Sequence, residues 1–352
     1  MKILIFGGAG FVGGNLAVKF AAEGHHITCV DNLVRRGSEN NLRRFLGNKN
    51  IDFIHADIRC REDLKNITVS PDIVLECSAQ PTAIDGYKNP MFDFTNNTGG
   101  LINVLEFCRE RSSALVFWST NKVYAGDKCN ATPIVERQTR LEWDDQAPAN
   151  IPGWSTKGFS EDFNVNGGNH TIYGVTKLTS DLFCQEWSTA FDIPIIINRF
   201  SCLYGPYQFG KVSQGWITWF VLAKKFGLDL AFYGFEGKQV RDYLHVDDMF
   251  ALIKAQIEKI DQHRGSYYNV GGGCDNTTSV RELEQLLTGM MGVQSTIHRG
   301  PPRNSDQKIY VSDITRVCDD FSWEPQVSFE EGIQSVIDWT NSGENFEWLP
   351  KK

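Results

Sequence analysis

The sequence has little of what marks membrane proteins, nucleic-acid-binding proteins or zinc proteins. None of its apolar runs is long enough for a membrane-spanning helix. Basic residues form no cluster, and the net charge of −8 does not suit a polyanionic partner. The nine cysteines are an odd number without a Cys-x-x-Cys pair, and there are no internal repeats or low-complexity tracts. We therefore expect no membrane, no nucleic acid and no metal, and a reducing compartment, the cytoplasm.

The chain begins with a glycine-rich loop between an apolar run and a helical pattern. Ile3 to Phe6 suits a strand that is buried on both faces, and Gly7, Gly10 and Gly13 follow it directly. Glycines at such a junction allow a tight turn and let the backbone approach a pyrophosphate at the helix N-terminus. The spacing differs by one residue from the Gly-x-Gly-x-x-Gly fingerprint, but the position in the chain agrees with it. The segment predicts a dinucleotide-binding site.

A carboxylate, Asp31, ends the next apolar run, where it can bind ribose hydroxyls of a dinucleotide. It favours NAD over NADP, because a carboxylate repels a 2′-phosphate, whereas Arg35 and Arg36 nearby would attract one. Asp57, with Ile58 beside it, has two equal interpretations, as a residue that faces the adenine or as an exposed loop acid. The cofactor that we expect is NAD.

Tyr173 and Lys177 are one helical turn apart and share a helix face. A free tyrosine, with a pKa of about 10, is a poor base, but a lysine ammonium and a nicotinamide cation nearby would lower that pKa. Thr120 ends an apolar strand, where ligands bind in parallel sheets, and can donate to the same substrate oxygen. We predict that Thr120, Tyr173 and Lys177 are catalytic, and that an alcohol or sugar carbon is oxidised or reduced beside the nicotinamide.

Strands and helices alternate along the first two hundred residues, which predicts a parallel, doubly wound sheet. The expected strands are 2–6, 26–30, 51–55, 72–77, 114–119 and 193–199, and helices near 12–23, 91–111 and 172–190 separate several of them. The pattern then becomes irregular, which indicates a second, smaller lobe built from discontinuous pieces. We expect an NAD-binding Rossmann domain at 1–200 plus about 243–268, and a substrate lobe at about 201–242 plus 269–352.

Further motifs are spread nearly end to end: Asp57-Ile58, Ser119-Thr120, Val123-Tyr124, Leu203-Tyr-Gly-Pro206, Arg241-Asp-Tyr-Leu-His-Val-Asp-Asp248 and Asn269-Val-Gly-Gly272. With the glycine loop and the Tyr173–Lys177 pair, they resemble the extended short-chain dehydrogenases/reductases of the nucleotide-sugar epimerase and dehydratase group. The resemblance implies bound NAD and a nucleotide-diphosphate sugar as substrate. It also implies that Arg241 and Arg303 bind the diphosphate, since guanidinium groups match phosphate oxygens.

Other residues complete the two predicted sites. Those for the cofactor are Phe11, Val12, Asn32 and Ala79, and those for the substrate are Gln80, Asn121, Lys122, Asn198 and Gln214. Lys122 has a second interpretation as a solvated loop charge. We also expect a homodimer or homotetramer.

Two local features narrow the predicted activity. Sugar 4,6-dehydratases of this group place Asp-Glu directly after the catalytic threonine, whereas this chain has Asn121 and Lys122 there. The segments Ser119-Thr-Asn-Lys-Val-Tyr124 and Gly210-Lys-Val-Ser-Gln-Gly215 are similar to those of the CDP-tyvelose (CDP-paratose) 2-epimerases. That resemblance implies inversion at C2 of a CDP-sugar by transient oxidation and re-reduction.

Three other functions remain open at this stage: a UDP-sugar 4-epimerase, an NAD(P)H-dependent keto-sugar reductase, and a nucleotide-sensing module without catalysis. The segment between Tyr124 and Tyr173 is unusually long. Long insertions in compact domains are usually functional, so we expect it to form a lid or binding loop.

Overall fold

The computed structural model describes residues 1–147, 150–343 and 346. Its largest element in these residues is a seven-stranded parallel sheet with the strand order β14-β10-β5-β4-β1-β2-β3. The strands are β1 (Lys2–Phe6), β2 (His26–Asp31), β3 (Ile51–His55), β4 (Ile73–Glu76), β5 (Ala114–Thr120), β10 (Ile195–Phe200) and β14 (Tyr267–Val270). The prediction of a doubly wound parallel sheet is confirmed.

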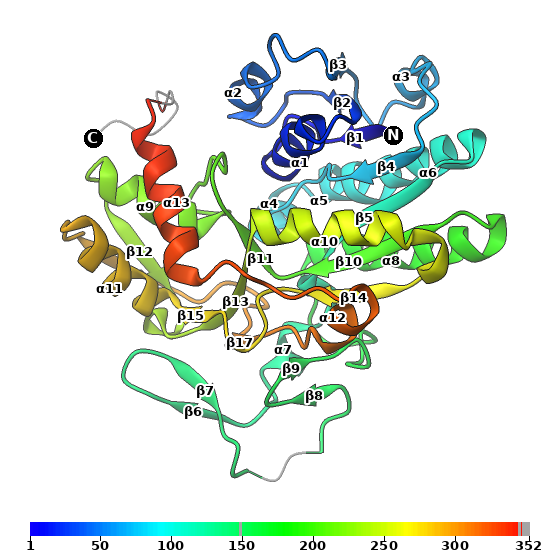
Figure 1. Ribbon diagram of the computed structural model, residues 1–352. Coiled ribbons are helices and arrows are strands. Elements are labelled where there is room, and N and C mark those ends of the chain that lie inside the picture. The colour runs from blue at the N-terminus through cyan, green and yellow to red at the C-terminus, as the bar shows by residue number, and fades with distance from the viewer. Residues whose placement is uncertain (148–149, 344–345, 347–352) are drawn as a thin grey trace.

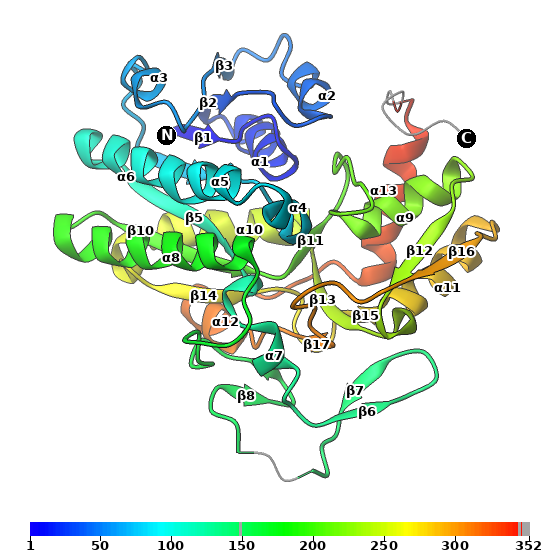
Figure 2. The same ribbon diagram turned by 180° about the vertical axis from the view of Figure 1, so that it is seen from behind.

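Helices cover both faces of this sheet, so most residues of its central strands are apolar. Ile3 and Ile5 pack toward α1 (Phe11–Ala22) and α10 (Val246–Glu258), while Leu4 and Phe6 pack toward the opposite layer. That layer contains α3 (Arg61–Lys65), α6 (Gly100–Arg111) and α8 (Ile172–Phe191). Figure 1 shows α10 in front of the sheet, and Figure 2 shows α6 and α8 in front of it. α2 (Ser38–Arg43) lies beside α1.

Three features of this domain differ from the predicted elements. β14 continues the sheet through residue 268, where the change of lobe was expected, and α12 (Thr315–Phe321) also packs on this domain, through Val317 and Phe321. The helix expected at 91–111 is divided into α5 (Pro90–Asp93), a π-helical turn (Phe94–Gly99) and α6, and α4 (Ala83–Lys88) precedes it. The π-helical turn places Asn97 so that its amide donates to the Gln80 carbonyl and the Thr176 hydroxyl.

The second lobe is smaller and is assembled from separate parts of the chain. One sheet joins β11 (Cys202–Tyr204), β13 (Val240–His245), β15 (Thr277–Ser279) and β17 (Ile309–Tyr310), and β12 (Leu230–Tyr233) pairs with β16 (Ile297–Gly300). Three helices pack on these strands: α9 (Trp216–Lys225), α11 (Val280–Met291) and α13 (Phe329–Asn341). Among the described residues, no helix combines the length and the apolar character needed to cross a lipid bilayer.

The long segment between β5 and α8 forms small elements along the lower edge of the molecule (Figures 1 and 2). They are α7 (Gly126–Cys129), the pair β6 (Ile134–Glu136) and β7 (Leu141–Trp143), and the pair β8 (Trp154–Ser155) and β9 (Gly158–Phe159). Phe159 and Phe163 of this segment pack with Tyr124 and with Tyr310 of the second lobe. The segment therefore contacts both lobes and stabilises their packing against each other.

Candidate active site

The glycine loop is shaped so that side chains would not fit in it. Gly7 has a φ of +72°, and a Cβ atom there would lie 2.7 Å from the Ser78 nitrogen. A Cβ atom on Gly13 would lie 2.3 Å from the Gly7 oxygen. α1 begins after Gly10 without a side-chain cap and without an acidic residue in its first turn, so its N-terminal N–H groups suit an anion. These features fit the pyrophosphate of a dinucleotide.

The predicted adenosine residues gather at the ends of β2 and β3. The Asp31 carboxylate accepts hydrogen bonds from the backbone N–H groups of Ala9, at 3.1 Å, and Leu33, at 2.8 Å. The Asn32 amide donates to Asp57 Oδ2 at 3.0 Å. Asp57 also pairs with Arg59, and this hydrogen bond is the main reason why the pKa of Asp57 falls to about 2. Asp31 thus holds the glycine loop, and Asp57 is a paired carboxylate rather than a free loop acid.

The structure brings the three predicted catalytic residues together. Thr120 ends β5, and Tyr173 lies in the first turn of α8, whose N-cap residue Thr171 accepts from the Gly174 N–H at 2.9 Å. Tyr173 shares a hydrogen bond with Thr120. Lys177 follows one helical turn later, with its Nζ 4.2 Å from the centre of the Phe117 ring. All three predicted residues are buried.

The electrostatics of Tyr173 differ from the expectation. Burial raises the pKa of Tyr173 to about 12, while the hydrogen bond to Thr120 opposes that rise and the charge of Asp93 adds to it. Lys177 is not among the causes of this shift, and burial lowers the pKa of Lys177 itself. Desolvation therefore dominates the pKa of Tyr173 among the protein's own residues, and the lowering of this pKa by Lys177 together with a nicotinamide cation stays a prediction.

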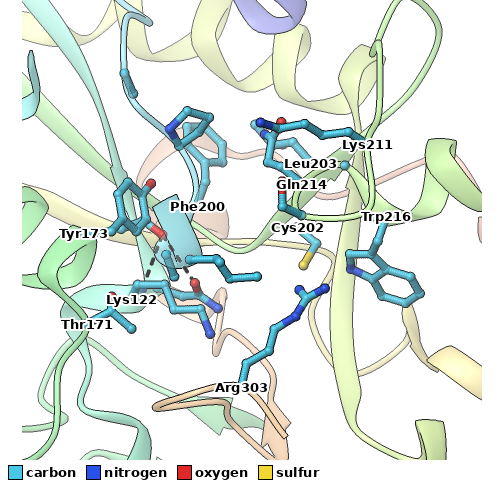
Figure 3. A pocket seen from close by; sticks show the side chains of 18 of the residues that line it. Lys122, Thr171, Tyr173, Phe200, Cys202, Leu203, Lys211, Gln214, Trp216 and Arg303 are labelled. Atoms are coloured by element: carbon cyan, nitrogen blue, oxygen red, sulfur yellow. Dashed lines mark hydrogen bonds between the residues drawn. The ribbon is translucent and has the colours of Figure 1, made fainter. Parts of the chain in front are cut away.

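A cavity of about 1110 Å³ runs from the glycine loop past Tyr173 into the second lobe. Pockets for one drug-sized ligand have about 300–1,000 Å³, so this cavity has room for a dinucleotide and a second ligand. The predicted residues that line it are Phe11, Val12, Ala79, Thr120, Asn121, Lys122, Tyr173, Lys177, Gln214, Arg241 and Arg303. Figure 3 shows Tyr173 and Lys122 on one wall and Trp216 on the other, with Arg303 extending toward Cys202 between them.

Three cationic side chains gather at the end of the cavity that lies in the second lobe. The Arg241 guanidinium donates to Asp306 Oδ1 at 2.8 Å, and Arg303 donates to the Val212 carbonyl at 3.0 Å. Within the described residues, the buried Nε of Arg303 has no hydrogen-bond partner. Lys122 donates to Gln307 Oε1 at 2.8 Å, and burial, with the nearby charge of Arg241, lowers the pKa of Lys122 to about 8. The arrangement suits an anionic ligand.

Comparison with known proteins identifies the family. The model of the NAD dependent epimerase/dehydratase family matches residues 3–271. This chain belongs to that family. The match covers the whole glycine loop and the Thr120, Tyr173 and Lys177 site, so the protein is an enzyme of the family and its cofactor is NAD.

Several relatives match over nearly their whole length. CDP-paratose 2-epimerase from Salmonella typhi is 33% identical over 350 residues, which are 97% of this chain and 100% of that protein. A putative UDP-glucose 4-epimerase from Methanocaldococcus jannaschii is 26% identical, with 96% and 97% of the two chains covered. The solved structure of Pal from Bacillus thuringiensis has a TM-score of 0.82 at 25% identity and covers 97% of this chain and 99% of that one.

Two residues predicted to contact the substrate do not line the cavity. Asn198 is fully buried in β10, where its amide exchanges hydrogen bonds of 2.7 and 2.8 Å with Gln256 of α10. The Gln80 amide donates to the Thr82 carbonyl at 2.8 Å and to Asp93 at 2.5 Å. Both side chains thus form hydrogen bonds with other buried parts of the protein rather than facing the cavity, contrary to the prediction.

The long segment after Tyr124 is not a lid over this cavity. Between residues 125 and 170, no described residue lines it. The segment instead supports the chain that follows Arg303: Asn130 donates to the Asp306 carbonyl at 2.9 Å and accepts from the Lys308 N–H at 2.6 Å. The prediction of a lid is wrong because the aromatic residues of the segment pack between the lobes rather than over the opening.

The sequence analysis also missed residues that do line the cavity. Trp216, Trp219 and Tyr233 give it a large aromatic surface, and Arg303 stacks 4.7 Å from the centre of the Tyr233 ring. The residues come from α9, which directly follows the segment 210–215, and from β12. The available signal in the sequence is the number of aromatic residues after residue 200, within the region expected to form the second lobe.

Proposed function

We propose that the protein is a nucleotide-sugar 2-epimerase that inverts C2 of a CDP-activated deoxyhexose by transient oxidation and re-reduction. The observation that supports it best is a single cavity that joins the dinucleotide loop, the hydrogen-bonded Thr120 and Tyr173, and the cationic cluster. The relative named CDP-paratose 2-epimerase supports the choice of CDP and C2.

The proposed proton transfer uses residues at the centre of the cavity. Tyr173 takes the proton from the C2 hydroxyl and returns it to the same oxygen after the keto sugar has turned. Thr120 donates a hydrogen bond to that oxygen, and Lys177 binds the nicotinamide ribose. NAD would supply reversible hydride transfer when bound, so the epimerisation would need no external reductant.

The cationic cluster is proposed to hold the other part of the substrate. Arg303 and Arg241 bind the diphosphate, for which the unpartnered Nε of Arg303 is one available donor. Lys122 and Asn121 contact the sugar beside Thr120. Neither of these two residues is a carboxylic acid, so elimination of water from the sugar has no acid–base pair at this place.

A UDP-sugar 4-epimerase is the second candidate, and the Methanocaldococcus relative favours it. The two functions are separated by incubating the purified protein, without added cofactor, with CDP- and UDP-sugars and following diastereomers by NMR. Inversion at C2 of a CDP-sugar supports the proposal, and inversion at C4 of a UDP-sugar replaces it. A reaction that needs added NADH or NADPH points to a keto-sugar reductase instead.

The proposal includes a cytoplasmic enzyme that forms a homodimer or homotetramer. All nine cysteines are free, as expected for a reducing compartment. Light scattering of the purified protein measures the oligomeric state.

A further inference from the structure

Glu76, the last residue of β4, places a carboxylate inside an apolar layer. It is 2% exposed, and its neighbours across the sheet are Phe6 in β1 and Phe117 in β5. Ser78 donates two hydrogen bonds to Oε1, from its backbone N–H at 3.1 Å and from its hydroxyl. Oε2 is buried and has no hydrogen-bond partner among the described residues. A buried carboxylate is costly unless an opposite charge compensates it.

The Lys177 ammonium is the opposite charge on this side of the sheet. Its Nζ lies over the ring of Phe117, the residue paired with Glu76 in the next strand, and neighbouring strands are about 4.8 Å apart. Burial raises the pKa of Glu76 and the Lys177 charge opposes that rise. Burial likewise lowers the pKa of Lys177, and the Glu76 charge is the strongest influence against it.

The other groups that face Lys177 do not replace Glu76. They are Asp181 and Cys184 from α8, and Cys77, which directly follows β4. The Asp181 carboxylate is already engaged, because it accepts from Arg199 Nε at 2.9 Å and from the Ser119 hydroxyl at 3.0 Å. Glu76 is therefore the carboxylate that remains for Lys177 among these groups.

We propose that Glu76 is a positioning residue that keeps the Lys177 ammonium charged and fixed beside Tyr173. Lys177 lines the cavity, whereas Glu76 does not. The inference rests on the proposed function in one respect, the assignment of Lys177 to the nicotinamide ribose beside Tyr173. The Glu76 carboxylate would be the opposite charge that keeps Lys177 protonated, although burial favours its neutral amine.

Glu76→Gln tests the inference through the pH profile of kcat. The variant keeps the size of the side chain and an acceptor for Ser78 but removes the charge. Lys177 then loses its proton at lower pH, so the alkaline limb of the profile moves to lower pH by about 1–3 units, which is the usual effect of a neighbouring opposite charge. KM for the sugar stays within about twofold, since Glu76 does not touch it.

Glu161→Gln is the matched control. Glu161 is also a buried carboxylate, 9% exposed, that accepts from the Asn269 N–H at 2.7 Å, and it does not act on Lys177. Its variant should keep the wild-type pH profile. A Glu76→Gln enzyme with the same alkaline limb as wild type would overturn the inference.

Lys177→Met provides a test without a substrate and without an active enzyme. Glu76 then becomes an unpaired buried carboxylate with a folded-state pKa raised above its unfolded value. The free-energy cost of burying its charge disappears as Glu76 is protonated. The Tm of Lys177→Met should therefore rise relative to wild type as the pH falls. The double variant Glu76→Gln/Lys177→Met should not show that rise. Parallel Tm curves for wild type and Lys177→Met would contradict the pairing. These curves do not depend on which sugar the enzyme uses, so failure of the proposed function leaves them interpretable.

Discussion

The Lys122 ammonium donates a hydrogen bond of 2.8 Å to Gln307 Oε1, which joins the turn after β5 to the chain that leads into β17. This contact holds a partly buried cation at the place where the cavity passes from the Rossmann domain into the second lobe. Gln307 is neutral, so the charge of Lys122 is not cancelled by its hydrogen-bond partner. It remains available to an anionic or oxygen-rich ligand.

We expect binding of the nucleotide sugar to depend on the charge of Lys122. Burial lowers the pKa of Lys122 to about 8, so the ammonium is present below this pH and is lost as the pH rises through it. Kd, measured by calorimetry on either side of pH 8, should increase at the higher pH. Lys122→Met should bind roughly tenfold to a hundredfold more weakly at neutral pH, the usual value of a hydrogen bond to a charged group, and lose most of the pH dependence. An unchanged Kd for the nucleotide sugar would show that Lys122 does not contribute to binding and would favour its interpretation as a solvated loop charge.

Tyr173→Phe is expected to reduce turnover by about 10²–10⁴-fold, the usual contribution of general acid–base catalysis. The ring stays in its buried place at the start of α8, so folding and NAD binding should be nearly unaffected. Circular dichroism and the NAD content of the purified variant are the controls. Turnover within about tenfold of wild type would show that Tyr173 is not the base.

The protein is expected to purify with NAD rather than NADP. Asp31 ends β2 beside the glycine loop, and its negative charge disfavours a 2′-phosphate. The measurement is chromatography of the nucleotide released by denaturation. Recovery of mostly NADP would mean that the nearby Arg35 outweighs Asp31.

A substrate deuterated at C2 should keep most of its label in the epimerised product. A hydride held on the nicotinamide does not exchange with water, whereas a proton removed beside a carbonyl does. NMR or mass spectrometry of the product measures the retained label, and no 4,6-dehydration product should appear. Complete loss of deuterium to solvent would indicate that the enzyme oxidises a neighbouring carbon, most simply C3, and that the resulting ketone then enolises.

The Rossmann domain was predictable because its signals are local. Ile3 to Phe6 is apolar on both faces, and the following glycines are needed where Cβ atoms would collide with the loop itself. The approach of Thr120 to Tyr173 followed from one general rule, that ligands bind at the carboxyl ends of parallel strands.

The remaining features depend on contacts between distant segments. Asn198 is indistinguishable in sequence from a ligand-binding amide, and only its pairing with Gln256 shows that it belongs to the core. The segment after Tyr124 is long enough to form a lid. Its position, however, depends on packing against Tyr310, which lies far along the chain. The rise in the pKa of Tyr173 likewise follows from burial, which no spacing of motifs reveals.

Ser119 and Thr120 are adjacent hydroxyl residues with separate tasks, because successive residues of a strand face opposite sides. Ser119 donates to Asp181 in the interior, and Thr120 meets Tyr173. A deletion or insertion of one residue in β5 would exchange the two directions and move the following side chains to the opposite face of the sheet. Replacement of one hydroxyl residue by the other changes only a methyl group. A change of one residue in the length of β5 would therefore disturb the site more than an exchange of serine and threonine at its end.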